Sequence, residues 1–129
     1  MENALHDWKK FLKKSGYFVF SELCWLKENI PQELANFFKR EYPAMKALEV
    51  NIKMIQSQGY TLLAHFTIPE ESWWWPYYTP LEPKLRKLKK KYRNDEEKMA
   101  QLEQVCLEIS TYRKYSTYYG NVFFVLKKK

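Results

Sequence analysis

The stretch WKKFLKKSGYFVFSE, residues 8–22, joins two patterns that together predict an α/β fold. Its first half closes a segment, residues 2–16, in which apolar side chains recur at helical spacing. Lysines in the last turn suit the negative end of a helix dipole, and Gly16 suits the residue that ends a helix. Its second half opens the nearly continuous apolar run 17–25, which is typical of a strand buried on both faces of a sheet.

The same two patterns continue outward along the chain. Helical spacing predicts helices over 30–43, 45–59 and 96–120, and apolar runs predict strands over 60–68 and 121–128. Alternation of this kind is typical of an α/β sheet covered by helices. With 129 residues, the chain has the length of one domain, and we expect residues 1–129 to form one.

An aromatic stretch, PEESWWWPYYTPLEP (69–83), interrupts this alternation. Four prolines punctuate it, which predicts an irregular connection. Three interpretations of its rings remain open: packing onto a helical layer, walls of a pocket for a small acceptor, or anchors for a second subunit.

The net charge of +7 raises the question of an acidic partner. The segment KLRKLKKKYR, residues 84–93, carries seven Lys and Arg and no acid, which accounts for the whole excess. Leucines at helical spacing favour an amphipathic helix with a solvated basic face, and a surface that contacts phosphates is the alternative. The terminal LKKK, residues 126–129, is predicted to fray.

Catalytic and metal-binding patterns are scarce. The three glycines each lie at an expected element boundary, so no glycine-rich phosphate loop is present. His6 and His65 have no metal-ligand spacing, and Cys24 and Cys106 are predicted to be buried, reduced thiols. Without a leader or a membrane-spanning run, we expect a cytoplasmic protein with no membrane partner.

Glu22 is the carboxylate that we single out as a candidate for a site. It lies at the expected C-terminal end of a buried strand, where ligand crevices form in open α/β sheets. It is a candidate ligand or proton acceptor, and the alternative is a solvated or helix-capping glutamate.

In sequence order, several segments resemble class I S-adenosylmethionine-dependent methyltransferases. The segment 8–22 is similar to their approach to the fifth strand, although Lys14 and Ser15 stand where the family has proline and glycine. The segment 51–74 resembles the following helix and sixth strand. The segments 78–92 and 108–128 resemble the tail, ending in the seventh strand, of a bacterial and archaeal small-molecule group.

This resemblance implies a partial Rossmann-like methyltransferase fold, the C-terminal, acceptor-side half. The family binds S-adenosylmethionine over its first four strands, and no residue of that site is present in this chain. We therefore expect no activity from the chain alone. A natural remnant, a misannotated start and a truncated product all remain open as its origin.

The resemblance also implies the order of a three-stranded mixed sheet: 17–23, then 121–127 in the centre and antiparallel to both neighbours, then 60–67. The exposed edge would be 17–23, and we expect a homodimer through that edge or through the aromatic stretch. The family's covering insertions suggest a substrate-binding set for a small-molecule acceptor. Its members would be Glu22, Trp25, Tyr42, Trp73, Trp74, Tyr77 and Tyr78. The alternative function is an RNA- or protein-binding module that uses helix 84–93 and rings 73–78; nucleic acid is the less expected partner.

Overall fold

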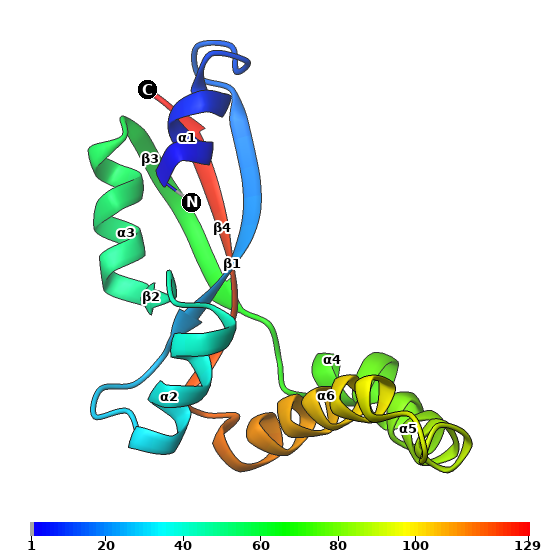
Figure 1. The fold of residues 1–129 in the computed structure, drawn as a ribbon. Coiled ribbons are helices and arrows are strands. Elements are labelled where there is room, and N and C mark those ends of the chain that lie inside the picture. Colours follow the sequence, from blue (N-terminus) through cyan, green and yellow to red (C-terminus); the bar gives the residue numbers. More distant parts are fainter. Residues whose placement is uncertain (1) are drawn as a thin grey trace. The chain divides into compact units, whose positions relative to one another are not determined.

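The computed structural model describes residues 2–129, with the side chains of residues 3–129 (Figure 1). The chain forms two compact units. Unit 1 comprises the residues up to Ile68 together with Thr117–Lys129, and unit 2 comprises Pro69–Ser116. Each unit is described here by itself.

Unit 1 contains the sheet and three helices. In chain order its elements are α1 (Glu2–Lys9), β1 (Tyr17–Trp25), α2 (Gln32–Glu41), β2 (Lys46–Ala47), α3 (Leu48–Ser57), β3 (Tyr60–Thr67) and β4 (Tyr119–Lys128).

The sheet has four strands in the order β2-β1-β4-β3, and β4 runs antiparallel to both β1 and β3. This confirms the α/β class and the predicted order of the three long strands. The prediction of only three strands is wrong, because β2 pairs in parallel with Cys24 and Trp25 of β1. Two residues at the start of a helical pattern carry too little periodicity to predict a strand.

The two faces of the sheet differ in burial. Face A carries Phe18, Phe20, Val122, Phe124 and Leu126, and the last three are fully buried. Face B carries Val19 and Ser21 of β1, Val125 and Phe123 opposite them on β4, and Phe66 of β3.

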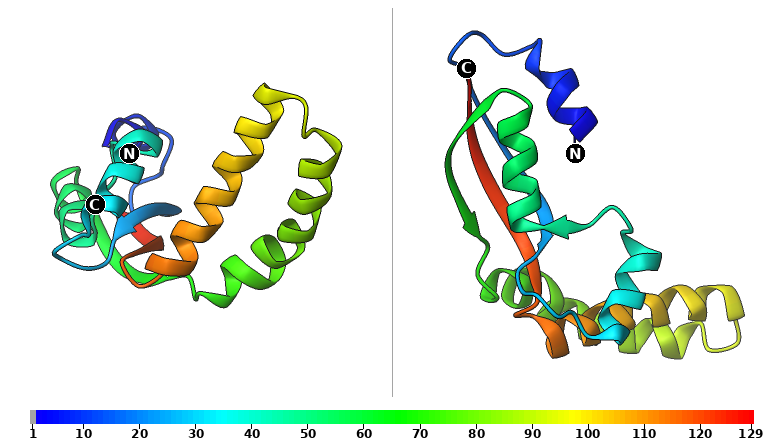
Figure 2. Two further views of the ribbon diagram at one scale, coloured as in Figure 1. Left: turned by 60° about the horizontal axis from the view of Figure 1, so that its bottom comes forward. Right: turned by 90° about the vertical axis from the view of Figure 1, so that its left-hand side faces the viewer.

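Within unit 1, helices α1 and α3 cover face A. Helices α1 and α3 lie on the same side of the sheet (Figure 2, right) and contribute Leu5 and Ile55 to its core. The strands were predicted to be buried on both faces, and this is wrong for face B, where Val19 and Phe66 are exposed.

Two helix ends in unit 1 differ in how well the sequence predicts them. Gly59 ends the segment after α3 with φ = 85°, a left-handed conformation that favours glycine, as expected. The first helix stops at Lys9 rather than near Gly16, and Ser15 adopts φ = 65° in the turn before β1.

Unit 2 is helical throughout its regular elements: α4 (Glu71–Trp73), one π-helical turn η1 (Trp74–Tyr78), α5 (Thr79–Lys91) and α6 (Glu96–Tyr115). The prediction of an irregular connection over 69–83 is therefore wrong. Proline removes a backbone donor, but its fixed φ is compatible with a helix, and the wider turn coincides with Pro76. Asp95 caps α6 by accepting a hydrogen bond from the Lys98 backbone N–H at 3.1 Å.

The buried row on β4 gives a stability prediction. Replacing Phe124, which is fully buried, by alanine removes its packing and leaves a cavity. We expect the free energy of unfolding to fall by about 3–5 kcal/mol, measured by urea denaturation. The matched control is Phe11→Ala, because Phe11 is 75% exposed. Equal losses in the two variants would contradict the assignment of the core to face A.

Candidate functional site

Glu22 lies within β1 on face A, opposite Val122, three residues before the strand ends, rather than at its C-terminal end as predicted. Its Oε1 accepts a hydrogen bond from the Tyr42 hydroxyl at 2.7 Å and another from the Leu23 backbone N–H at 3.1 Å. The carboxylate is therefore held in place by its own strand and by the residue that ends α2.

Tyr42 reaches Glu22 because α2 ends there. A proline ring makes helical geometry unfavourable for the residue before it. Tyr42, which precedes Pro43, accordingly adopts φ = −151° and ψ = 75°. Its backbone N–H still donates to the Phe38 carbonyl at 2.8 Å. Burial, followed by the hydrogen bond to Glu22, raises the pKa of the Tyr42 hydroxyl to about 12. At neutral pH the Tyr42 hydroxyl is therefore protonated and acts as a hydrogen-bond donor to Glu22.

A small pocket of about 250 Å³ adjoins Tyr42. Its lining residues are Trp25, Ala35, Phe38, Lys39, Tyr42, Pro43 and Met45. The Trp25 ring meets Phe38 edge-on, with centroids 5.3 Å apart and an interplanar angle of 85°. A pocket with apolar walls and a few polar groups suits one small ring or a short chain better than a nucleotide.

Cys24 lies two residues after Glu22 on β1, and Asn51 of α3 lies beside it. Both side chains are buried. The Asn51 side-chain amide donates to the Cys24 Sγ at 3.1 Å, and that thiol contacts the Glu22 carbonyl at 3.4 Å. Burial is the main cause that raises the pKa of Cys24 to about 11, so it is a protonated, unreactive thiol, as expected. Cys106 is only partly buried, contrary to expectation.

Asn51 went unnoticed in the sequence. The available signal was a polar residue inside the apolar stripe of helix 45–59. A buried amide needs a partner, and here it joins α3 to β1 through the Cys24 thiol.

The aromatic residues of the 69–83 stretch lie in unit 2, where three of them pack on α6. Trp73 stacks on Tyr112 with centroids 4.7 Å apart, and Trp74 lies 6.0 Å from the same ring. Tyr78 is 1% exposed and donates a hydrogen bond from its hydroxyl to Glu108 at 3.0 Å. These rings form the core of unit 2, whereas Trp75 and Tyr77 point to solvent.

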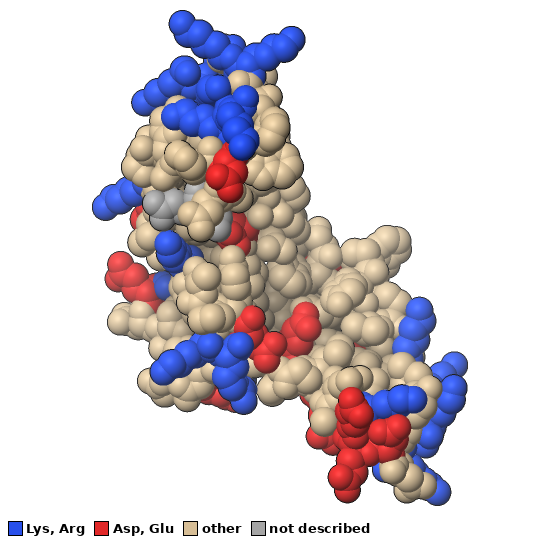
Figure 3. All heavy atoms as spheres, turned by 45° about the horizontal axis from the view of Figure 1, so that its top comes forward, with Lys and Arg blue, Asp and Glu red and all other residues tan. Residues whose placement is uncertain are grey.

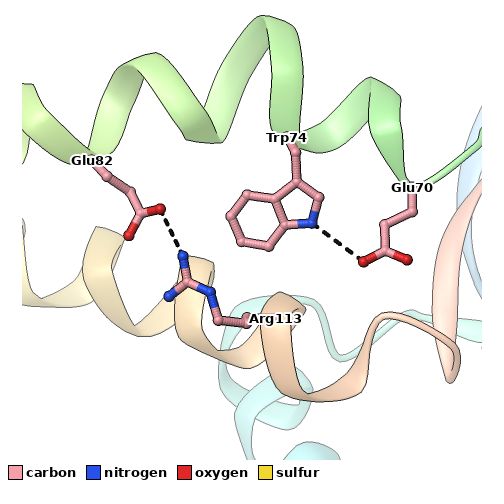
Figure 4. A network of polar contacts seen from close by, with 4 residues as sticks. All are labelled: Glu70, Trp74, Glu82 and Arg113. Carbon is pink, nitrogen blue, oxygen red and sulfur yellow. Dashed lines mark hydrogen bonds and ion pairs between the residues drawn. The ribbon is translucent and has the colours of Figure 1, made fainter.

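Polar contacts fix the orientation of Trp74 (Figure 4). Its indole N–H donates to Glu70 at 3.3 Å, and the Arg113 guanidinium lies 4.8 Å from the ring centroid. Arg113 of α6 also forms an ion pair with Glu82 of α5, in which the guanidinium nitrogen lies 2.6 Å from the carboxylate oxygen. Burial, and then the charges of Glu70 and Glu71, raises the pKa of Tyr112 beneath this network to about 12.

The seven predicted substrate-binding residues thus fall into two groups. Glu22, Trp25 and Tyr42 come together in unit 1, the first bonded to the third and the last two lining one pocket. The other four, Trp73, Trp74, Tyr77 and Tyr78, belong to unit 2 and contact rings within it.

Basic side chains gather in several places on the surface, two of which bear on the predictions (Figure 3). One is α5, where Leu85 is buried and Lys90 and Lys91 of the last turn are exposed, as the amphipathic interpretation predicts. The other lies around α1 and the end of β4, where the Lys128 ammonium donates to the carbonyls of Lys9 and Leu12 at 2.8 and 2.9 Å. The predicted fraying of LKKK is therefore wrong up to Lys128.

Residues 2–129 contain neither a cluster of metal-ligating side chains nor a helix that could span a membrane. No three His, Cys, Asp or Glu side chains in this range are arranged to hold a metal ion. Within the same range, every helix is too short or too polar to cross a bilayer.

Comparisons with known proteins identify the fold. No protein-family model matches the sequence, and no curated protein does. Among solved structures, a methyltransferase from Geobacter sulfurreducens, S-adenosylmethionine-dependent and bound to S-adenosylhomocysteine, matches 100% of this chain with a TM-score of 0.73 and 17% identity. Its counterpart from Thiobacillus denitrificans, also with S-adenosylhomocysteine, matches 100% with a TM-score of 0.73 and 18% identity. YjhP from E. coli matches 93% with a TM-score of 0.70 and 17% identity.

The match covers only part of those proteins. This chain accounts for 52% of the Geobacter and Thiobacillus chains and 49% of YjhP, so it spans about half the length of the structures that it matches. The likeness shows that the chain has the fold of part of a class I methyltransferase domain.

The Glu22–Tyr42 contact predicts a pH-dependent contribution to stability. Tyr42→Phe removes a hydrogen bond to a carboxylate, so we expect a loss of about 1–3 kcal/mol in the free energy of unfolding at pH 7. The folded-state pKa of Tyr42 is raised from 10.0 to about 12, so its contribution is complete below pH 10 and disappears as the pH rises through 12. Urea denaturation of both proteins from pH 7 to 12 measures the difference.

The control for Tyr42→Phe is Tyr77→Phe, because Tyr77 is 52% exposed. This variant should change the free energy of unfolding by less than about 0.5 kcal/mol. A pH-independent difference between wild type and Tyr42→Phe would contradict the assigned bond.

The packing of the aromatic run gives a third prediction. Tyr78→Ala should destabilise unit 2 by about 3–5 kcal/mol, because it removes a buried ring and its bond to Glu108. Hydrogen exchange of the α6 amides reports on this unit directly. Tyr77→Ala, at the neighbouring exposed position, should leave that exchange nearly unchanged; similar acceleration in both variants would argue against a core role for Tyr78.

Proposed function

We propose that this chain is the acceptor-side, C-terminal half of an S-adenosylmethionine-dependent methyltransferase for a small molecule, inactive by itself. The observation that carries the proposal is the fold match over 93–100% of this chain and only about half of each matching chain. Two of those matches are named as methyltransferases crystallised with S-adenosylhomocysteine, the product form of the methyl donor.

The residues of this chain do not fit the methyl donor. Binding the donor's ribose and amino acid requires a backbone that approaches closely, usually through glycines that precede a helix. Here Gly16 precedes β1, Gly59 separates α3 from β3, and Gly120 lies within β4. None opens a helix, so the donor site is proposed to lie outside this chain, and we derive no step through it.

The pocket lined by Trp25 and Tyr42 is the proposed acceptor site. Methyl transfer is an in-line displacement that depends mainly on positioning, helped in some enzymes by a base. Trp25 and the neighbouring apolar side chains would hold the body of the acceptor, and Tyr42 would orient one polar group. Glu22, fixed by Tyr42, would accept a proton from a hydroxyl or amine of the acceptor.

A partner-binding module remains the alternative function. Exposed lysines on α5 and the exposed rings of Trp75 and Tyr77 are its support, since bases of single-stranded RNA stack on such rings. Against it, Trp73, Trp74 and Tyr78 are engaged within unit 2. An affinity for RNA that falls steeply with salt would favour this alternative.

Two titrations of the isolated chain test the proposal. S-adenosylhomocysteine, followed by calorimetry, should show no binding tighter than about 1 mM, because the donor site is absent. Catechol and phenylethylamine, followed by NMR, should shift the Trp25 indole N–H resonance, and Tyr42→Ala should abolish that shift whereas Tyr77→Ala preserves it. Micromolar affinity for S-adenosylhomocysteine would refute the proposed division of the fold, and an unmoved Trp25 signal would refute the acceptor pocket.

A further inference from the structure

Lysines from two distant segments of the sequence gather at one end of the sheet in unit 1. The segments are 8–17 and 127–129, and neither contains an acidic residue. Tyr17 of β1 pairs with Lys127 of β4, so the two segments meet where β1 begins and β4 ends (Figure 3). We call this surface the basic end. Its seven lysines are Lys9, Lys10, Lys13, Lys14, Lys127, Lys128 and Lys129.

Hydrogen bonds hold the basic end in a fixed shape. The Lys128 backbone N–H donates to the Gly16 carbonyl at 2.9 Å, and the Ser15 N–H donates to the Lys128 carbonyl at 3.1 Å. The Lys9 ammonium donates to the Gln58 carbonyl at 2.8 Å, so this lysine and Lys128 fasten the surface from within. The lysines whose side chains are exposed are Lys10, Lys13, Lys14 and Lys129.

Three aromatic side chains stand among these lysines. Phe11 is 75% exposed, Tyr17 is 65% exposed and Trp8 is 53% exposed. Phe11 lies in the turn between α1 and β1, beyond the end of the helix. Large exposed rings surrounded by ammonium groups suit the boundary of an anionic bilayer, where rings enter between the headgroups and lysines meet the headgroup charges.

The ring contacts favour a bilayer over a nucleic acid. Single-stranded RNA binds through bases that stack on open ring faces. Here Trp8 stacks on Phe18 with centroids 5.7 Å apart, and the Lys10 ammonium lies 5.2 Å from the Phe11 ring centroid. One face of each ring is therefore already covered. Every cation of the two segments is a lysine, whereas nucleic-acid sites favour the planar guanidinium of arginine.

We propose that the basic end is a docking surface for an anionic lipid bilayer. Phe11 enters the boundary between headgroups and acyl chains, and the exposed lysines around it contact the headgroup charges. Each lysine near an anionic leaflet contributes roughly a fivefold gain in affinity. The expectation of no membrane partner rested on the lack of a spanning run, and binding at the surface needs none. This proposal does not depend on the proposed function.

The orientation of β1 has a consequence for the candidate pocket. Strand β1 has nine residues, from Tyr17 at the basic end to Trp25 at the pocket. At about 3.3 Å per residue, the two ends of the strand are about 26 Å apart. A bilayer bound at the basic end therefore leaves the pocket clear of the headgroups. If the proposed function holds, the acceptor reaches the pocket from solution rather than from the same bilayer.

Sedimentation with lipid vesicles tests the docking surface. The chain should sediment with vesicles made of equal parts of phosphatidylcholine and phosphatidylserine, and stay in solution with vesicles of phosphatidylcholine alone. Raising the salt concentration from about 0.1 M to about 1 M shortens the Debye length from about 10 Å to about 3 Å, so we expect binding to weaken about tenfold or more.

Matched charge reversals locate the contact. A variant with Lys13→Glu and Lys14→Glu should bind the mixed vesicles about tenfold more weakly or worse, because two attractive charges become repulsive. The control carries Lys90→Glu and Lys91→Glu on α5, which are also exposed. It has the same net charge as the first variant, and its affinity should stay within about twofold of wild type.

An exchange of rings tests the apolar part of the contact. Phe11→Ser should weaken vesicle binding about tenfold, because the ring no longer leaves water on binding. Trp75→Ser removes a ring of unit 2 that is 82% exposed and should leave binding unchanged. Both substitutions lie at exposed positions, and urea denaturation of each variant checks that it is folded.

Four results would overturn the proposal. One is the absence of binding to the mixed vesicles at low salt. Another is equal weakening by the two charge reversals, which would reduce the effect to net charge. The third is a Phe11→Ser variant that binds as wild type does, which would remove the inserted ring. The fourth is binding of a uridine oligonucleotide through Lys13 and Lys14 without vesicle binding, which would make single-stranded RNA the occupant.

Discussion

The structure depends on the central position of β4. Its side chains on face A, Val122, Phe124 and Leu126, are fully buried, and its backbone pairs on one side with β1 and on the other with β3. Strand β4 is the last strand in sequence, and it lies between β1 and β3, which are far apart in sequence. Folding of unit 1 therefore requires the two ends of the chain to meet, and helices α1 and α3 complete the core only on the face that this row defines.

The candidate site follows from the same constraint. Pairing with β4 places Glu22 on face A, and the end of α2 at Pro43 brings Tyr42 within 2.7 Å of it. Beneath the pair, Asn51 ties α3 to Cys24. The Glu22 carboxylate is thus held by its own strand and by the residue that ends α2, and α3 is bonded to the same strand through Cys24. These bonds make the position of the carboxylate rigid. That rigidity is what a reaction governed by positioning requires.

The sequence predicted the long elements well because their periodicity is strong. The order of the three long strands came from the methyltransferase resemblance, and the structure confirms it. Three features escaped prediction for physical reasons. Strand β2 is too short to show a period, Pro76 and its neighbours suggested a loop although proline's φ suits a helix, and the bond from Asn51 to Cys24 depends on tertiary contact. Of the seven predicted substrate-binding residues, Glu22, Trp25 and Tyr42 lie together in unit 1 and the other four lie in unit 2. The division into two units was not visible in composition.

The wrong prediction for face B is itself informative about β1. A strand with one solvated face normally alternates apolar and polar residues, whereas Tyr17–Phe20 is apolar at every position. Within the described chain, half of those side chains face solvent, with Val19 more than half exposed. Exposed apolar side chains on a strand edge favour aggregation, and a polar residue at position 19 would cost the observed core nothing. The apolar pattern of β1 therefore matches a strand buried on both sides, whereas within unit 1 helices α1 and α3 cover only its face A side.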